Sequence, residues 1–147
     1  MSQESLEIVR RAYEVLNTGG TIDDLMAGLA PLLDPQAEWV NPPDALERGT
    51  RAGLDGWRIA LGNIRAGLGE SVKLDVHELV DDGDAVFAAG EVQTSGTSSG
   101  VEAAGPTWAA IWTVSDGRIR RYEWSWDTAG TRARFKGMEG PPNSGSG

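Results

Sequence analysis

The sequence predicts an α+β protein in which helices pack on one face of a curved antiparallel sheet. Apolar residues recur at helical spacing in the first half of the chain, and strand-like alternation with turn signals dominates the second half. The 147 residues include no cysteine and suffice for one domain with a substantial core. We therefore expect a single domain over residues 1–137 and a flexible tail rich in glycine, serine and proline over residues 138–147.

Three segments are predicted to form the helical layer. Residues 3–17 place their apolar side chains on one face of a helix. The second helix begins at Thr21, which forms a capping-box pattern with Asp24, and Pro31 is expected to break it into two pieces. Residues 54–68 carry the third amphipathic pattern. These helices precede nearly all of the strands.

The predicted sheet starts with a short strand over residues 37–41, and a polar loop over residues 44–53 separates this strand from the third helix. From residue 71 onward the chain alternates between strands and turns, with tight turns predicted at residues 81–84 and 115–117. The remaining segments are listed in order: strands over residues 85–94 and 101–114, a last strand that ends at residue 127, and a short helix over residues 128–136.

Four of the six tryptophans lie in the last two predicted strands. Trp108 and Trp112 are separated by an even number of residues, and so are Tyr122, Trp124 and Trp126. Since side chains at even spacing share one face of a strand, each segment presents an aromatic stripe. The stripes either pack the core or line an apolar pocket, and the pattern alone leaves both alternatives open.

Charge and composition exclude several classes of partner. The formal net charge of -9 argues against nucleic acid and anionic membranes, whose phosphates would repel this chain. Since there is neither an apolar run of about 20 residues nor a signal peptide pattern, we expect a cytoplasmic protein. His77 is the one histidine, which argues against a histidine-based metal site or a Ser-His-Asp triad. We predict neither a metal nor a cofactor.

Four motifs in order carry a resemblance to a known family: WVNPP at residues 39–43, RGTRAGLDGW at 48–57, ELVDDGD at 78–84 and WTVSDGRIRRYEWSWD at 112–127. Together they resemble the NTF2-like superfamily, in particular its SnoaL-like branch, over about residues 4–137. The resemblance implies a cone-shaped sheet wrapped against three helices around a blind pocket. It also implies a homodimer through the outer face of the sheet. Since the superfamily includes enzymes and binding modules, function must be argued from the site.

The known chemistries of this superfamily match the chain poorly. For a ketosteroid isomerase, the position of the base falls on Asn41 and that of the protonated acid on Ala110, while Tyr13 lies close to the place of the tyrosine. For an epoxide hydrolase, Asn41 matches a group that holds water, but one of the required aspartates falls on Trp124. Neither register of the strand over residues 85–94 restores the Arg-x-Asp pair of that site.

A polyketide cyclase would need a carboxylate in the pocket, and two candidates exist. Glu91 faces the pocket in one of two possible registers, where burial would raise its pKa, and is a solvated strand residue in the other. Asp127 either serves catalysis or caps the following helix. Asn41 is the best polar candidate, although it could instead bond the backbone before Pro42.

We therefore predict a pocket that binds a hydrophobic or aromatic small molecule, with general acid/base catalysis by Glu91, Asp127 or Asn41 as a further possibility. The alternative is a non-catalytic binding or assembly module whose aromatic residues fill the cone. The aromatic residues predicted to line the pocket are Tyr13, Trp39, Trp57, Trp108, Trp112, Tyr122, Trp124 and Trp126.

Overall fold

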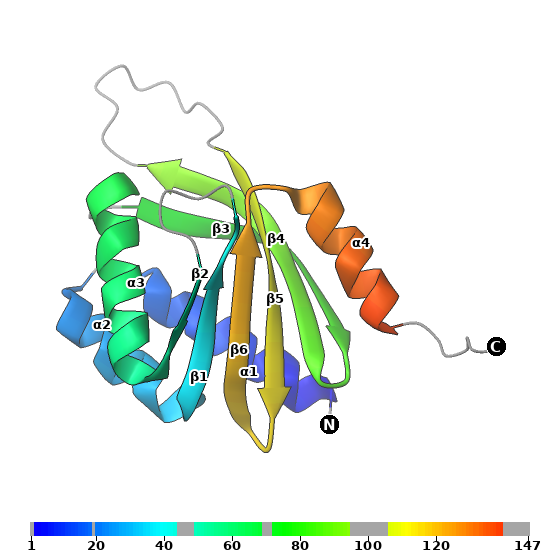
Figure 1. Ribbon diagram of the computed structural model, residues 1–147, viewed down its shortest axis with the longest axis horizontal. Helices are drawn as coiled ribbons and strands as arrows, with labels where there is room; N and C mark the ends of the chain where they lie inside the picture. The colour runs from blue at the N-terminus through cyan, green and yellow to red at the C-terminus, as the bar shows by residue number, and fades with distance from the viewer. Residues whose placement is uncertain (1, 19, 44–48, 69–71, 95–105, 140–147) are drawn as a thin grey trace.

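The computed structural model describes residues 2–18, 20–43, 49–68, 72–94 and 106–139, which form an α+β fold. The predicted fold class is confirmed. The strands form one sheet in the order β2-β1-β6-β5-β4-β3 (Figure 1). In chain order the elements are α1 (Ser2–Leu16), α2 (Ile22–Leu29), a 3₁₀ turn η1 (Ala30–Leu32), β1 (Leu33–Asn41), β2 (Gly49–Ala52), α3 (Gly53–Leu68), β3 (Val72–Asp82), β4 (Ala85–Thr94), β5 (Thr107–Ser115), β6 (Arg118–Ser125) and α4 (Thr128–Glu139).

The sheet is antiparallel except for the pair of β1 with β6, which is parallel. Because helix α3 and four strands separate β1 from β6 in sequence, no hairpin fixes their relative direction. Both predicted turns form, with positive φ at Gly83 in one and at Asp116 and Gly117 in the other. Register shifts in three strand pairs accompany the curvature of the open sheet.

The two faces of the sheet carry separate hydrophobic clusters. Helices α1, α2 and α3 cover the inner face, where the larger cluster includes Val9, Leu29 and Trp57. Helix α4 lies along β4 and β5 on the opposite, outer face, where Phe135 packs against Phe87 at 5.7 Å between ring centroids (Figure 1). The described residues include no helix that is long and apolar enough to cross a membrane.

The helix starts and stops follow from the sequence. Thr21 and Asp24 form the predicted capping box, in which each side chain accepts from the other residue's backbone N–H. Pro31 lies in the 3₁₀ turn that ends α2, as expected for a residue that cannot donate within a helix.

Some predicted boundaries were wrong. The first strand starts at Leu33, four residues earlier than predicted, and Leu33 pairs with Ile119 of β6. The polar residues that follow Leu33 hide the apolar alternation by which a strand is recognised in the sequence. The predicted loop over residues 44–53 contains β2, a short edge strand whose residues show no apolar alternation. The first part of the predicted strand over residues 101–114, the connection before it, and most of the predicted tail lie outside the described residues.

Candidate functional site

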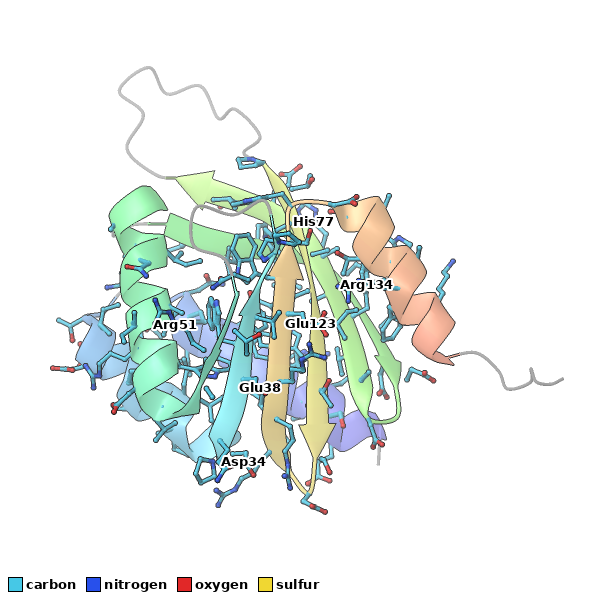
Figure 2. The ribbon with its side chains drawn as sticks, in the orientation of Figure 1. Asp34, Glu38, Arg51, His77, Glu123 and Arg134 are labelled. Carbon is cyan, nitrogen blue, oxygen red and sulfur yellow. The ribbon has the colours of Figure 1, made fainter. Side chains whose placement is uncertain are left out.

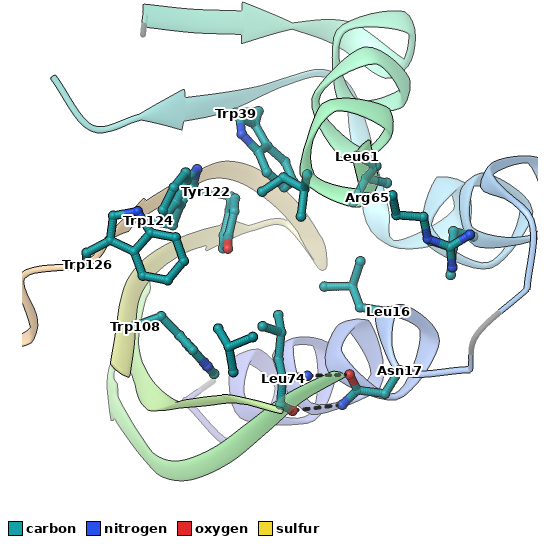
Figure 3. Close-up of a pocket in the computed structure, with 13 residues that line it drawn as sticks. Leu16, Asn17, Trp39, Leu61, Arg65, Leu74, Trp108, Tyr122, Trp124 and Trp126 are labelled. Atoms are coloured by element: carbon teal, nitrogen blue, oxygen red, sulfur yellow. Dashed lines mark hydrogen bonds between the residues drawn. The ribbon is translucent and has the colours of Figure 1, made fainter. Parts of the chain in front are cut away.

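A partly open cavity lies between the inner face of the sheet and the helices (Figure 3). The volume of the cavity is about 70 Å³, which is enough for more than one water molecule. The cavity is lined mainly by apolar and aromatic side chains. The lining residues are Leu16, Asn17, Leu25, Trp39, Leu61, Ile64, Arg65, Leu74, Val92, Trp108, Tyr122, Trp124 and Trp126.

Strand pairing places the aromatic residues of the cavity on the inner face of the sheet. Trp39 of β1 pairs with Tyr122 of β6, and their rings lie 4.6 Å apart between centroids. Trp124, two residues beyond Tyr122, contacts Trp126 edge to face at 5.1 Å. Trp108 completes this wall from β5, where it pairs with a glycine of β4. The five aromatic side chains therefore form one continuous wall of the cavity (Figure 3).

Three aromatic residues predicted for the pocket lie behind this wall. Tyr13, Trp57 and Trp112 are buried in the core and do not line the cavity. The indole nitrogen of Trp112 donates a hydrogen bond of 2.9 Å to the hydroxyl of Tyr13, and that of Trp57 donates to the carbonyl of Ala37 at 3.1 Å. These satisfied contacts show that part of the cone is filled, so the cavity is smaller than the number of aromatic residues suggests.

Asn41 joins two tryptophans of the cavity wall. Its side-chain oxygen accepts hydrogen bonds of 2.8 Å from the indole nitrogens of both Trp39 and Trp124. Since an indole nitrogen only donates, this pair of bonds fixes the orientation of the amide. The amide nitrogen of Asn41 is buried without a partner. The residue therefore positions the wall and does not itself line the cavity.

The structure does not bring the two candidate carboxylates to the cavity. Glu91 pairs with Asp75 and Thr107, one residue away from the pair formed by Gly90 and Trp108, so its side chain lies on the opposite face of the sheet. The carboxylate of Asp127 accepts a hydrogen bond of 2.9 Å from the backbone of Gly130 and caps α4. None of the described residues that line the cavity carries a carboxylate.

Sequence reasoning missed the residues that the helices contribute to the cavity. Asn17, just beyond the last turn of α1, donates to the carbonyl and accepts from the amide of Leu74, both at 2.9 Å, and so ties α1 to the edge strand β3 (Figure 3). Arg65 is the one charged residue among the described residues that line the cavity. Its position four residues after Leu61, on the same face of α3, was a signal that could have identified it.

Two tyrosines of the core remain protonated. Burial, with Tyr122 as the second cause, raises the pKa of Tyr13, and the hydrogen bond from Trp112 offsets only part of this rise. Burial also raises the pKa of Tyr122. Both phenols are therefore neutral near pH 7. Tyr122 can donate a hydrogen bond from the wall of the cavity.

A curved sheet covered by helices on its inner face, with an aromatic cavity between the layers, defines the NTF2-like class of small α+β domains. The chain matches the SnoaL-like domain over residues 9–122, and it therefore belongs to this family. No curated protein sequence matches the chain.

Solved structures show the same fold at low sequence identity. TerC, co-crystallised with polyporic acid, is 24% identical with a TM-score of 0.67, and the match covers 90% of this chain and 98% of TerC. Bal32a, from a soil-derived mobile gene cassette, is 20% identical with a TM-score of 0.69, covering 87% and 93% of the two chains. A putative SnoaL-like polyketide cyclase from Jannaschia sp. CCS1 is 16% identical with a TM-score of 0.65, covering 96% and 95%.

Proposed function

We propose that the protein binds a planar, mainly apolar small molecule in the cavity between the sheet and helices. The observation that carries this proposal is the wall formed by Trp39, Trp108, Tyr122, Trp124 and Trp126. Aromatic faces bury large areas of a flat ligand, and Leu, Ile and Val side chains close the opposite side.

The charge of the cavity restricts the ligand further. Arg65 is half-buried at the edge of the cavity and has no ion pair with another described residue. A ligand with an acidic group near the end of α3 therefore fits better than a cation. TerC was co-crystallised with polyporic acid, which agrees with a preference for a ligand that carries an acidic group.

We propose binding, without catalysis by a carboxylate. General acid/base catalysis of the cyclase type requires a carboxylate within reach of the ligand. Glu91 lies on the outer face, and the carboxylate of Asp127 caps α4. The described lining residues therefore supply shape, apolar surface and hydrogen bonds, and they supply no carboxylate base.

Filling the cavity tests the proposal. Leu16 lies at the end of α1 and points into the cavity (Figure 3). In Leu16→Trp the added indole occupies the ligand's space, so the affinity for 2-acetylnaphthalene, measured by isothermal titration calorimetry, should fall by about tenfold or more. The buried core away from the cavity is unchanged in this variant.

Ile59→Trp is the matched control, because it adds the same side chain at an exposed position of α3 outside the cavity. It should bind the probe as tightly as the unmodified protein does. Equal affinities of the Leu16→Trp variant and the unmodified protein would place the probe elsewhere and refute binding in this cavity.

A further inference from the structure

Tyr122 places a phenol hydroxyl at the wall of the cavity. The residue is 5% exposed and lines the cavity from β6. Figure 3 shows its oxygen directed into the cavity. The hydroxyl has no hydrogen-bond partner among the described residues, and it is not one of their fully enclosed polar atoms, so a ligand in the cavity can reach it. An unpartnered polar group in an otherwise apolar wall indicates a role in binding.

Three indoles fix the direction of this hydroxyl. The ring of Tyr122 lies 4.4 Å from that of Trp112, 4.6 Å from that of Trp39 and 5.8 Å from that of Trp57, all measured between centroids. Rotation of the ring away from the cavity would disrupt all three contacts. The phenol is therefore held in place before a ligand arrives, so little conformational entropy is lost on binding.

Most other polar groups around the cavity are already engaged or enclosed. The indole nitrogens of Trp39 and Trp124 donate to Asn41, and the amide of Asn17 is bonded to the backbone of Leu74. The indole nitrogen of Trp108 has no partner, but protein atoms enclose it. On the sheet side of the cavity the hydroxyl of Tyr122 and the indole nitrogen of Trp126 thus remain as donors without a partner among the described residues, and the hydroxyl is directed into the cavity (Figure 3).

We propose that the hydroxyl of Tyr122 donates a hydrogen bond to an oxygen acceptor of the ligand, such as a carbonyl oxygen, and so favours an oxygen-bearing ligand over a hydrocarbon of the same shape. This inference rests on the proposed function, since it needs a ligand in the cavity. The phenol is suited to this role because burial raises its pKa and keeps it protonated across the physiological range. A carbonyl oxygen would supply the missing partner, while a hydrocarbon would leave the hydroxyl unsatisfied.

The test compares two probes of the same shape, 2-acetylnaphthalene and 2-isopropenylnaphthalene, which differ by an oxygen in place of a methylene group. Calorimetry gives the affinity of both probes for the unmodified protein and for Tyr122→Phe. Loss of one hydrogen bond should lower the affinity for the ketone by about 3- to 10-fold and leave that for the alkene unchanged or slightly higher. The difference in hydration between the two probes is the same for both proteins, so it cancels when the ratio of affinities is compared between the unmodified protein and Tyr122→Phe.

Tyr13→Phe is the matched control, because it removes a buried phenol hydroxyl that bonds Trp112 and lies outside the cavity lining. It should leave the ratio of affinities unchanged. If Tyr122→Phe changes both affinities equally or neither, the hydrogen bond is refuted while binding in the cavity stands. If neither probe binds the unmodified protein, the proposed function and this inference both fail.

Discussion

Gly90 of β4 lies opposite Trp108 of β5, where no side chain separates the indole from the backbone of the neighbouring strand. A Cβ added to Gly90 would lie 1.8 Å from the carbonyl oxygen of Asp75 and 3.1 Å from the ring of Trp108. The close approach of β3 and the position of the indole therefore both depend on the absence of a side chain. Glycine within a strand often marks such an approach.

We expect Gly90→Ala to destabilise the protein by about 1–3 kcal/mol, because backbone must move to admit the methyl group. Urea denaturation measures the change in the free energy of unfolding. The matched control is Gly62→Ala in α3, where an added Cβ meets no atom within 4 Å. It should stabilise the helix by about 0.5–1 kcal/mol, so equal effects of the two substitutions would contradict the packing argument.

For single residues, the sequence predicted which aromatic side chains share a face of the sheet, but not which of them line the cavity. Even spacing placed Trp108, Tyr122 and Trp124 on one face, because strand periodicity is local. Whether each ring lines the cavity depends on contacts between elements distant in sequence, which bury Trp57 and Trp112 away from the cavity and leave Tyr122 in its wall. The face of Glu91 could not be predicted, since small residues occupy both faces of β4.

The terminal helix α4 is held to the outer face of the sheet by charged contacts around one aromatic pair. Arg132 bonds both carboxylate oxygens of Glu78, at 2.6 and 2.8 Å, and its guanidinium lies 4.8 Å from the centroid of Phe87. Thr131 and Phe135 are buried beneath the helix. The helix therefore covers the smaller hydrophobic cluster with few apolar side chains of its own.

These contacts predict a pH dependence of stability. The hydrogen bond from Arg132 lowers the pKa of Glu78 below its ordinary value of 4.5. A lowered pKa in the folded state contributes stability above pH 4.5, which is lost as the pH falls through the lowered value. Glu78→Gln should remove this contribution, so the variant is less stable at pH 7 and approaches the unmodified protein in acid.

The difference should be small, because both side chains of the pair are more than a third exposed and solvent screens their attraction. Urea denaturation at pH 7 and below pH 4 gives the two values. Glu7→Gln, which removes an exposed pair with Arg10 on α1, is the control and should change stability less. A difference for Glu78→Gln that is as large in acid as at pH 7 would contradict the ionic origin of the effect.

A bulge in β3 explains why the sequence pattern did not predict that Glu78 faces α4. The pattern of Leu74 and Val76 on the inner face would also place Glu78 there. The register of β3 against β4 shifts between Val76 and Glu78, so Glu78 faces outward and Leu79 packs against the main core. Sequence periodicity predicts each half of this strand but does not show where the extra residue lies.

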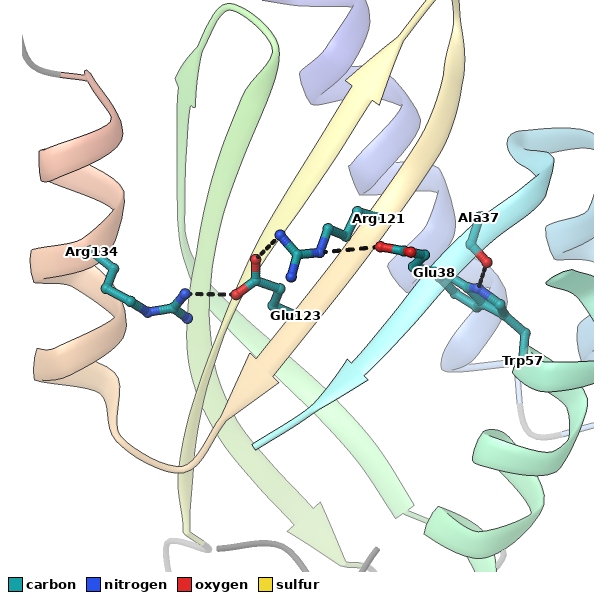
Figure 4. Close-up of polar contacts among 6 residues, drawn as sticks. All are labelled: Ala37, Glu38, Trp57, Arg121, Glu123 and Arg134. Carbon is teal, nitrogen blue, oxygen red and sulfur yellow. Dashed lines mark hydrogen bonds and ion pairs between the residues drawn. The ribbon is translucent and has the colours of Figure 1, made fainter. Parts of the chain in front are cut away.

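Taken as a whole, the molecule combines an apolar inner surface with a charged outer one. Where α4 does not cover the outer face, Glu38, Arg121, Glu123 and Arg134 form a chain of ion pairs across β1, β6 and α4 (Figure 4). Glu123 is the buried member of this chain, and Figure 2 labels it together with Glu38 and Arg134. The order of helices and strands predicted the fold from sequence, while the covering of β4 and β5 by α4 depends on long-range contacts.

This arrangement restricts how two copies could associate. The resemblance to NTF2-like proteins led us to expect a homodimer through the outer face, and α4 covers the apolar part of that face. The predicted dimer would therefore have to meet over the charged part of this face on β1 and β6, which includes Glu38 and Arg121. Such an interface is weakened by salt, because screening reduces the attraction between exposed charges.

Analytical ultracentrifugation should therefore show a dimer that dissociates more readily at about 0.5 M salt than at about 0.05 M. Glu38→Arg places a second cation beside Arg121, which approaches Glu38 to 3.6 Å within one chain, and should favour the monomer. The control is Glu14→Arg, which changes the net charge by the same amount at an exposed position of α1 and should leave the dimer unchanged. A monomer under all conditions, or a dimer indifferent to salt and to Glu38→Arg, would show that β1 and β6 do not form the interface.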